Sequence, residues 1–122
     1  MNGYLWRVKF VPMDSNLLVD RTNELRVATT DPRTHSVYIS EELDGEFLAT
    51  VLLHELGHCV IFSYDLLDDI HSTVHPAYWM DAEEWICNFI ADYGRQVFNV
   101  AHGILGEEVW TFIPYELERL IV

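Results

Sequence analysis

Two histidines near the middle of the chain have the spacing of ligands to a single metal ion. In the segment His54-Glu55-Leu56-Gly57-His58, the histidines are about one helical turn apart, so both imidazoles can face the same side of a helix. Zinc lowers the pKa of a bound water molecule towards neutrality, and the adjacent Glu55 can accept the proton as a general base. A random ordering of this composition would contain His-Glu-x-x-His only about 0.03 times.

A helix whose histidines face solvent, or hydrogen-bond a carbonyl group, is the alternative to a metal site. The residues around the motif argue against it, because Leu52, Leu53, Val60 and Ile61 are all apolar. Unpaired polar groups in such a helix would be energetically costly. The sequence therefore favours a metal site with His54 and His58 as ligands.

A catalytic zinc ion needs a third protein ligand and an open coordination position. The downstream candidates are His71, His75, Glu83, Glu84 and His102. Glu84 is favoured over Glu83, because Asn88 follows it by one turn and could orient a ligand histidine through its other ring nitrogen. Cys87 holds that position relative to Glu83 and suits the role less well. For both glutamates, the alternative is a solvated acidic helix start that interacts favourably with the helix dipole.

Residues 25–100 resemble small zincin metallopeptidase domains, especially phage- and mobile-element-borne proteins of the ImmA/IrrE type. In that family a short strand precedes the helix that carries HExxH, and a later helix supplies a glutamate in a pattern close to E-x-x-A-N-x-F-A. The corresponding segment here is Glu84-Trp85-Ile86-Cys87-Asn88-Phe89-Ile90-Ala91. Cys87 replaces the first alanine of that pattern, and Ile90 replaces the phenylalanine.

This resemblance implies a gluzincin-like, zinc-dependent metallopeptidase that hydrolyses an amide bond of a protein or peptide. By analogy His54, His58 and Glu84 bind one zinc ion, and Glu55 is the catalytic base. The main alternative is a non-catalytic, zinc-stabilised module of phage type that keeps the site and binds a protein partner. Another alternative keeps the fold and has lost the metal. Two imidazoles and a carboxylate also suit manganese, iron or cobalt.

A second resemblance offers a different third ligand. The segment His75-Pro76-Ala77-Tyr78-Trp79 looks similar to the region around the third histidine of SprT-like metalloproteases, which would make His75 a ligand. SprT-like proteins act on DNA-bound proteins, and a chain of net charge −13 fits that role poorly. The spacing selects no residue to stabilise an oxyanion. The candidates for that role are Tyr64, His71, His75 and Tyr78.

Hydrophobic patterning predicts the elements that position these residues. Strands are expected at 4–12, 25–30 and 35–40, with Val37 and Ile39 on one face of the last. A helix is expected from Phe47 to Phe62, capped by Ser40 or Asp44, and a second from Ala82 to about Val100, capped by Asp81. The connecting segments are an acidic loop or short helix at 65–76 and a last amphipathic piece at 107–122. The sequence thus predicts one α+β domain over residues 1–122, a minimal zincin-like fold with a small antiparallel sheet against two ligand-bearing helices.

Composition excludes several classes of partner. The 122 residues contain 7 Lys+Arg and 20 Asp+Glu, and so acidic a surface repels nucleic acids and anionic lipids. No apolar run approaches the length of about 18 residues that spans a bilayer, and the N-terminus lacks signal-peptide regions. With only Cys59 and Cys87 as cysteines, we expect free thiols and a cytoplasmic protein. The oligomeric state does not follow from the sequence.

Overall fold

The computed structural model describes residues 1–111 and 121, and these form an α+β fold, as predicted. The strands are β1 (Arg7–Val11), β2 (Ala28–Asp31) and β3 (Ser36–Ser40). The α-helices are α1 (Gly45–Ser63), α2 (Leu67–His71) and α3 (Trp79–Leu105), and short 3-10 helices are η1 (Asn16–Leu18), η2 (Pro76–Tyr78) and η3 (Gly106–Trp110). Of the predicted last segment, η3 covers the start, and most of the rest lies outside the described residues.

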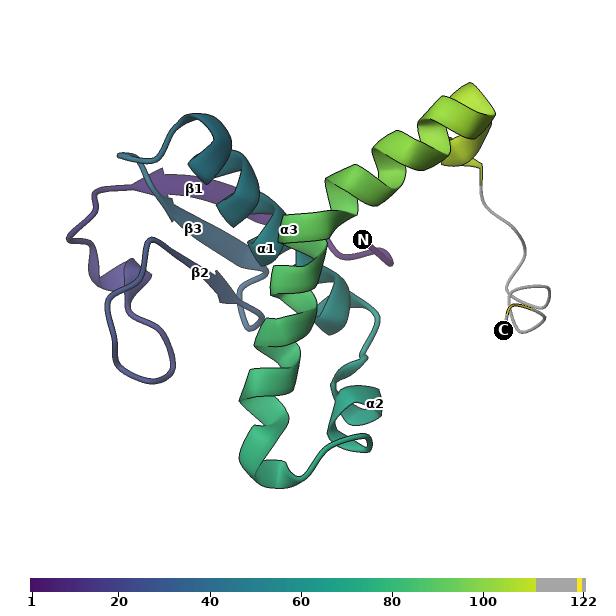
Figure 1. Ribbon diagram of the computed structural model, residues 1–122. Helices are drawn as coiled ribbons and strands as arrows, with labels where there is room; N and C mark the ends of the chain where they lie inside the picture. The colour runs from purple at the N-terminus through teal and green to yellow at the C-terminus, as the bar shows by residue number, and fades with distance from the viewer. Residues whose placement is uncertain (112–120, 122) are drawn as a thin grey trace. The chain divides into compact units, whose positions relative to one another are not determined.

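The strands form a mixed sheet in the order β1-β3-β2 (Figure 1). β2 and β3 pair antiparallel, with Ala28 opposite Ile39, whereas β1 and β3 pair in parallel, with Arg7 opposite Ser36. The prediction of a wholly antiparallel sheet is therefore wrong for β1. Only β2 and β3 are joined by a tight turn, which forces the antiparallel direction. A long connection separates β1 from its partner and permits either direction.

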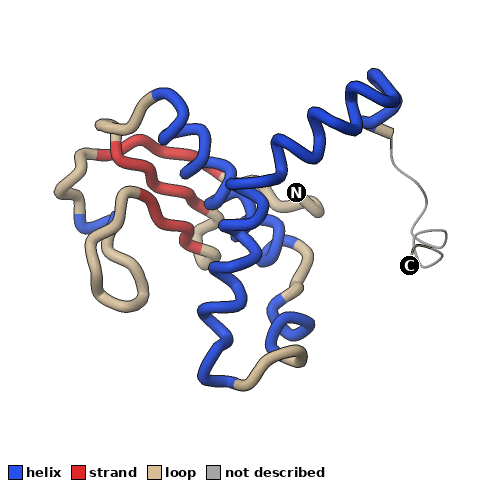
Figure 2. The backbone as a smooth tube through the Cα atoms, in the orientation of Figure 1, coloured by secondary structure: helices blue, strands red, loops and turns tan. Residues whose placement is uncertain are grey.

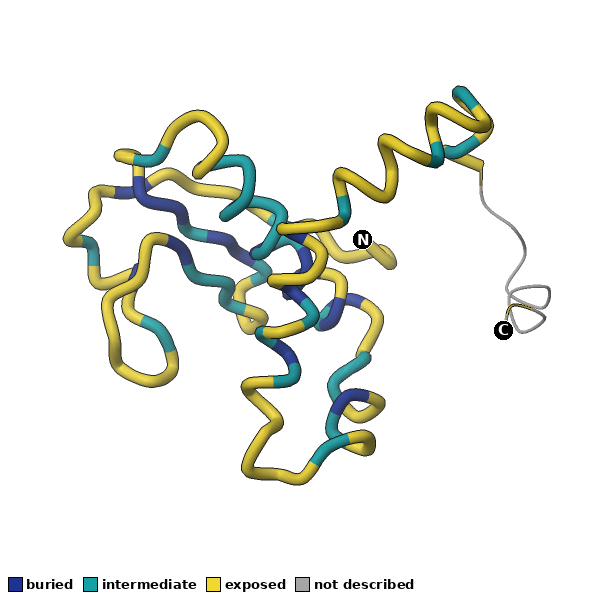
Figure 3. Tube along the Cα trace, in the orientation of Figure 1, coloured by how far each residue is buried: buried dark blue, intermediate teal, exposed yellow. Residues whose placement is uncertain are grey.

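One cluster of core residues lies between the sheet and α1 (Figures 2 and 3). A second cluster contains Ile61, Ile70 and Cys87 of the three α-helices. Val37 and Ile39 are fully buried on β3 and pack in one cluster with Cys59 of α1, which confirms that both strand residues share a face. Each fully buried aliphatic side chain stabilises such a core by about 2 kcal/mol. Cys59 and Cys87 are both buried free thiols, as expected.

α1 carries the His54–His58 motif and ends in a specific turn. Asp65 follows the helix with φ of 55°, and the Leu66 N–H donates to the carbonyl of Ile61 at 2.9 Å. This Schellman arrangement satisfies the last carbonyls of the helix and turns the chain towards α2. By length and composition α1 could also cross a membrane, with a mean hydropathy of 1.3, but core helices meet the same criterion.

α3 starts earlier than predicted, and Asp81 lies in its first turn rather than at its cap. The reason is that η2, which has His75 at its own N-cap, runs directly into α3. α3 passes close to α1 at Gly57, where an added Cβ would lie 3.1 Å from the Cys87 Sγ. The glycine of the His-Glu-x-x-His motif therefore lets α1 and α3, which carry the predicted ligands, approach closely.

The chain divides into two compact units, Met1–Asp92 and Tyr93–Val122. The first contains the sheet, α1, α2 and the first part of α3, and it carries every residue of the site below. Within the second unit the rings of Phe98 and Trp110 stack, with centroids 5.6 Å apart. That residues 1–122 form a single domain stays a prediction.

Candidate metal centre

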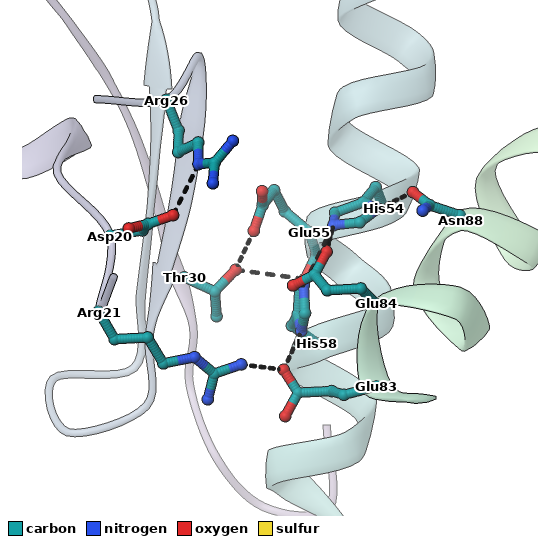
Figure 4. A network of polar contacts seen from close by, with 10 residues as sticks. All are labelled: Asp20, Arg21, Arg26, Thr30, His54, Glu55, His58, Glu83, Glu84 and Asn88. Carbon is teal, nitrogen blue, oxygen red and sulfur yellow. Dashed lines mark hydrogen bonds and ion pairs between the residues drawn. The ribbon is translucent and has the colours of Figure 1, made fainter. Parts of the chain in front are cut away.

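Three electron-pair donors from two helices converge at one point (Figure 4). The Nε2 atoms of His54 and His58 on α1 are 3.1 Å apart. Glu84 on α3 approaches both rings, with Oε2 at 3.1 Å from His54 Nε2 and Oε1 at 3.2 Å from His58 Nε2. Within the described part of the chain, His54, His58 and Glu84 form the cluster of side chains that could hold a metal ion.

The spacing of these atoms fits a small divalent ion. Two ligand atoms that each lie about 2.1 Å from a tetrahedral zinc ion are about 3.4 Å from one another. The observed separations of 3.1 and 3.2 Å, which involve different oxygens of Glu84, are close to that value. With one ligand atom from each residue, the three atoms lie within 4.8 Å of one another. Two imidazoles and a carboxylate are also a common ligand set for zinc. The residues present therefore fit a metal ion in size and in chemistry.

The other nitrogen of each ring is held by a residue of α3. His54 Nδ1 lies 2.8 Å from Asn88 Oδ1, and His58 Nδ1 lies 2.9 Å from Glu83 Oε2. When each Nδ1–H donates to its oxygen, the lone pair of each Nε2 faces the shared point. The predicted contact of Asn88 with a ring nitrogen of one motif histidine is confirmed for His54.

Glu83, a candidate ligand from the sequence, contacts Nδ1 of His58 and not the Nε2 atoms that face the shared point. It is 2% exposed and lies behind His58, where its Oε2 also accepts a hydrogen bond from Arg21 Nη2 at 2.5 Å. Glu84, which is 45% exposed, faces the Nε2 atoms instead. Adjacent helical positions point about 100° apart, which is why one glutamate lies beside each nitrogen of His58.

These contacts perturb the ionisation of the metal-free site. The hydrogen bond that His54 donates to Glu84 is the main cause of the raised pKa of His54, and the hydrogen bonds from His54 and His58 lower the pKa of Glu84. For His58, burial opposes protonation, but contacts with Cys87, Glu83 and Glu84 outweigh it and raise the pKa. The site thus stabilises positive charge, so protons and metal ions compete for it.

Glu55 lies in the wall of the same cavity as the three converging side chains. The cavity has a volume of about 1270 Å³ and is lined by α1, α3, β2 and the segment before β2. Glu55 is buried, and its Oε2 accepts a hydrogen bond from Thr30 Oγ1 at 2.5 Å. The structure therefore places the predicted base beside the candidate metal ligands, with Thr30 of β2 fixing one of its oxygens (Figure 4).

The other candidates lie elsewhere. His75 caps η2, where its Nδ1 accepts from the Ala77 N–H at 3.1 Å, and His71 stacks on Trp79 at 4.2 Å. His102 contacts Glu107 at 3.2 Å in the second unit. The candidates for stabilising an oxyanion do not line the cavity; these are Tyr64, His71, His75 and Tyr78. The cavity is lined instead by three arginines, Arg21, Arg26 and Arg33. Their spacing in the sequence does not indicate that they lie near the site.

No protein-family model, curated protein or solved structure matches this chain.

Proposed function

We propose that this chain is a zinc-dependent metallopeptidase of the zincin type, similar to the ImmA/IrrE-type proteins, and that it hydrolyses an amide bond of a protein or peptide. One observation carries the proposal. Two imidazole nitrogens and a carboxylate converge within 3.2 Å of one another, while a further carboxylate, Glu55, lies in the same cavity. Two imidazole nitrogens and a carboxylate that meet at one point are a ligand set suited to a divalent cation.

The residues of the site divide the work. His54, His58 and Glu84 would bind the ion, and Asn88 and Glu83 would keep the two rings oriented. When bound, zinc supplies a Lewis acid that polarises a carbonyl group and makes water more acidic. Glu55 would take the proton of the attacking water on Oε1, since Thr30 donates to Oε2. It would then return the proton to the leaving amine.

Metal content tests the first part of this proposal. The wild type and Glu84→Ala, purified side by side and then offered zinc, are compared by elemental analysis after the excess is removed. We expect about one zinc per wild-type chain and a clear loss in Glu84→Ala. A wild type without zinc would contradict the proposal and leave a metal-free scaffold.

Glu55→Gln tests the second part. With a broad peptide library as substrate, we expect the wild type to cleave and Glu55→Gln to lose cleavage while it keeps its zinc and its melting temperature. Loss of zinc in Glu55→Gln would contradict the role of Glu55 as a base. The charge of Glu55 is removed but its shape is kept, so the variant isolates proton transfer.

The burial of Glu55 favours a second candidate function, a zinc-stabilised module that binds a protein partner without cleaving it. At 6% exposure, and held by Thr30, Glu55 could serve chiefly to join β2 to α1. Under that function Glu55→Gln lowers the stability of the chain, and the wild type cleaves no member of the library. The two functions therefore differ in whether Glu55→Gln changes turnover or unfolding.

A further inference from the structure

Arg21 reaches the buried side of the metal centre from a segment far away in the sequence. Its Nη2–H donates to Glu83 Oε2 at 2.5 Å, and the same oxygen lies 2.9 Å from His58 Nδ1. Glu83 is only 2% exposed, whereas the Arg21 side chain is 51% exposed, so Arg21 reaches from the surface to a buried carboxylate. The three side chains form a continuous path from the segment before β2 to a candidate metal ligand (Figure 4).

The segment that carries Arg21 is held in a defined turn by Asp20. Asp20 Oδ1 accepts from the Thr22 N–H at 2.8 Å and the Glu24 N–H at 3.1 Å, while Oδ2 accepts from Arg26 Nε at 2.6 Å. The backbone of Asp20 also pairs with Glu24, since the Asp20 N–H donates to the Glu24 carbonyl at 2.9 Å. Arg21 therefore projects from a turn whose geometry is fixed independently of the metal site.

We infer that Arg21 is a positioning residue of the metal centre, which acts on His58 through Glu83. Two donors on one oxygen restrain rotation of the Glu83 carboxylate, and the restrained carboxylate holds the His58 ring with Nε2 towards Glu84. Partners of this kind typically alter metal affinity about 10- to 100-fold. The inference rests on the proposed function for the identity of the ion, but the orientation of His58 is a property of the metal-free chain.

If Arg21 acted only through its charge, replacing it would change the metal affinity in the opposite direction. Loss of a positive charge near the site would strengthen the binding of a divalent cation by Coulomb attraction, whereas loss of the positioning contact weakens it. Arg33 provides the matched control, because it lines the same cavity but is 87% exposed and lies 3.8 Å from Asp31. Replacing it removes the same charge without touching Glu83.

The experiment compares the zinc affinity of Arg21→Met and Arg33→Met by competition with a chromophoric chelator. Methionine keeps the apolar stem and removes the donors. Because Arg21 acts through Glu83, we expect about tenfold weaker binding in Arg21→Met, unchanged or tighter binding in Arg33→Met, and an intermediate value in Arg21→Lys. Binding by Arg21→Met as tight as that of Arg33→Met would overturn the inference. If Arg21→Met does not fold, Arg21→Lys against Arg33→Lys decides the inference at constant charge, with weaker zinc binding expected in Arg21→Lys alone.

A second readout separates this inference from the proposed function. In the metal-free full chain, long-range ¹H–¹⁵N correlation spectra of the histidine rings report the state of the His58 Nδ1 proton, which donates to Glu83 whether the ring carries one proton or two. We expect one sharp Nδ1–H signal in the wild type, and several signals or exchange broadening in Arg21→Met. An identical His58 spectrum in the two proteins overturns the inference. A wild type that binds no zinc overturns the proposed function alone, because the spectra still decide the role of Arg21.

Discussion

The two histidines of the candidate metal centre are held in different environments. His58 has a side chain that is 8% exposed, and its partner Glu83 is 2% exposed and anchored in turn by Arg21. His54 is 18% exposed, Asn88 lies on the surface, and Glu84, which approaches both rings, is 45% exposed. One side of the centre is thus built into the interior, and the other lies towards solvent.

The two environments have different consequences for the stability of the fold and for the binding of a metal ion. A buried carboxylate that loses a partner cannot be rescued by water, so the His58 side must form together with the fold. The His54 side can exchange its contacts with water at a modest energetic cost. We therefore expect substitutions on the buried side to change the stability of the chain, and substitutions on the exposed side to change chiefly the affinity for the metal.

The adjacent glutamates give the largest expected contrast. Glu83→Ala leaves His58 without its buried partner and should lower the free energy of unfolding of the metal-free chain by about 3 kcal/mol. Glu84→Ala removes a half-exposed group and should lower it by less than about 1 kcal/mol, yet it should abolish zinc binding. Urea unfolding in the presence of a chelator measures the first effect, and elemental analysis the second.

Glu83→Gln is the control for this contrast, since it keeps an acceptor for His58 Nδ1 and removes the charge. We expect an intermediate loss of stability. Equal destabilisation by Glu83→Ala and Glu84→Ala would remove the distinction between the two sides.

Gly57→Ala tests whether the buried side depends on the close approach of α1 and α3. The added Cβ would lie 3.1 Å from Cys87 Sγ and 3.4 Å from Cys87 Cα. Overpacking of this kind should lower the free energy of unfolding by about 2 kcal/mol, and because α3 must shift, zinc binding should weaken too. Thermal or urea unfolding and chelator competition measure the two effects.

Two further variants control for helix propensity and for the contact itself. Gly103→Ala lies in α3 with nothing within 4 Å of the added Cβ, so it should stabilise the chain by up to about 1 kcal/mol. Cys87→Ala combined with Gly57→Ala removes the Sγ and should recover part of the loss. An additive double variant would show that the contact with Cys87 is not the cause.

The parts of this site that the sequence predicted are those encoded within one helical turn. His54 and His58, and likewise Glu84 and Asn88, are each four positions apart, so helical periodicity alone places each pair on one face. Once both pairs lie on facing helices, the convergence of His54, His58 and Glu84 and the contact of Asn88 with His54 follow. The α+β class and the shared face of Val37 and Ile39 are encoded by similarly short periods.

The parts that the sequence did not predict depend on long-range packing. Arg21 and Glu83 are separated by 62 positions, and Thr30 and Glu55 by 25, so no local period relates them. The parallel direction of β1 has the same origin, because alternation along a strand identifies its faces but not the direction of its partner. Glu83 has the residue type of a metal ligand, but the sequence does not show that its side chain is buried against Nδ1 of His58.

Asn88 gives the smallest expected effect and tests the exposed side directly. Asn88→Ala removes the acceptor 2.8 Å from His54 Nδ1, and because this side faces solvent, water can partly replace it. Zinc affinity should therefore fall by about tenfold, the lower end of the range for such partners, with no measurable change in unfolding of the metal-free chain. Asn88→Asp keeps an acceptor, adds negative charge near the ion, and should bind zinc at least as tightly as the wild type. Chelator competition on the two variants measures both. A loss of stability in Asn88→Ala equal to that in Glu83→Ala would show that burial does not distinguish the two histidines, and that a ring orientation fixed from the surface is as important to the fold as one fixed in the core.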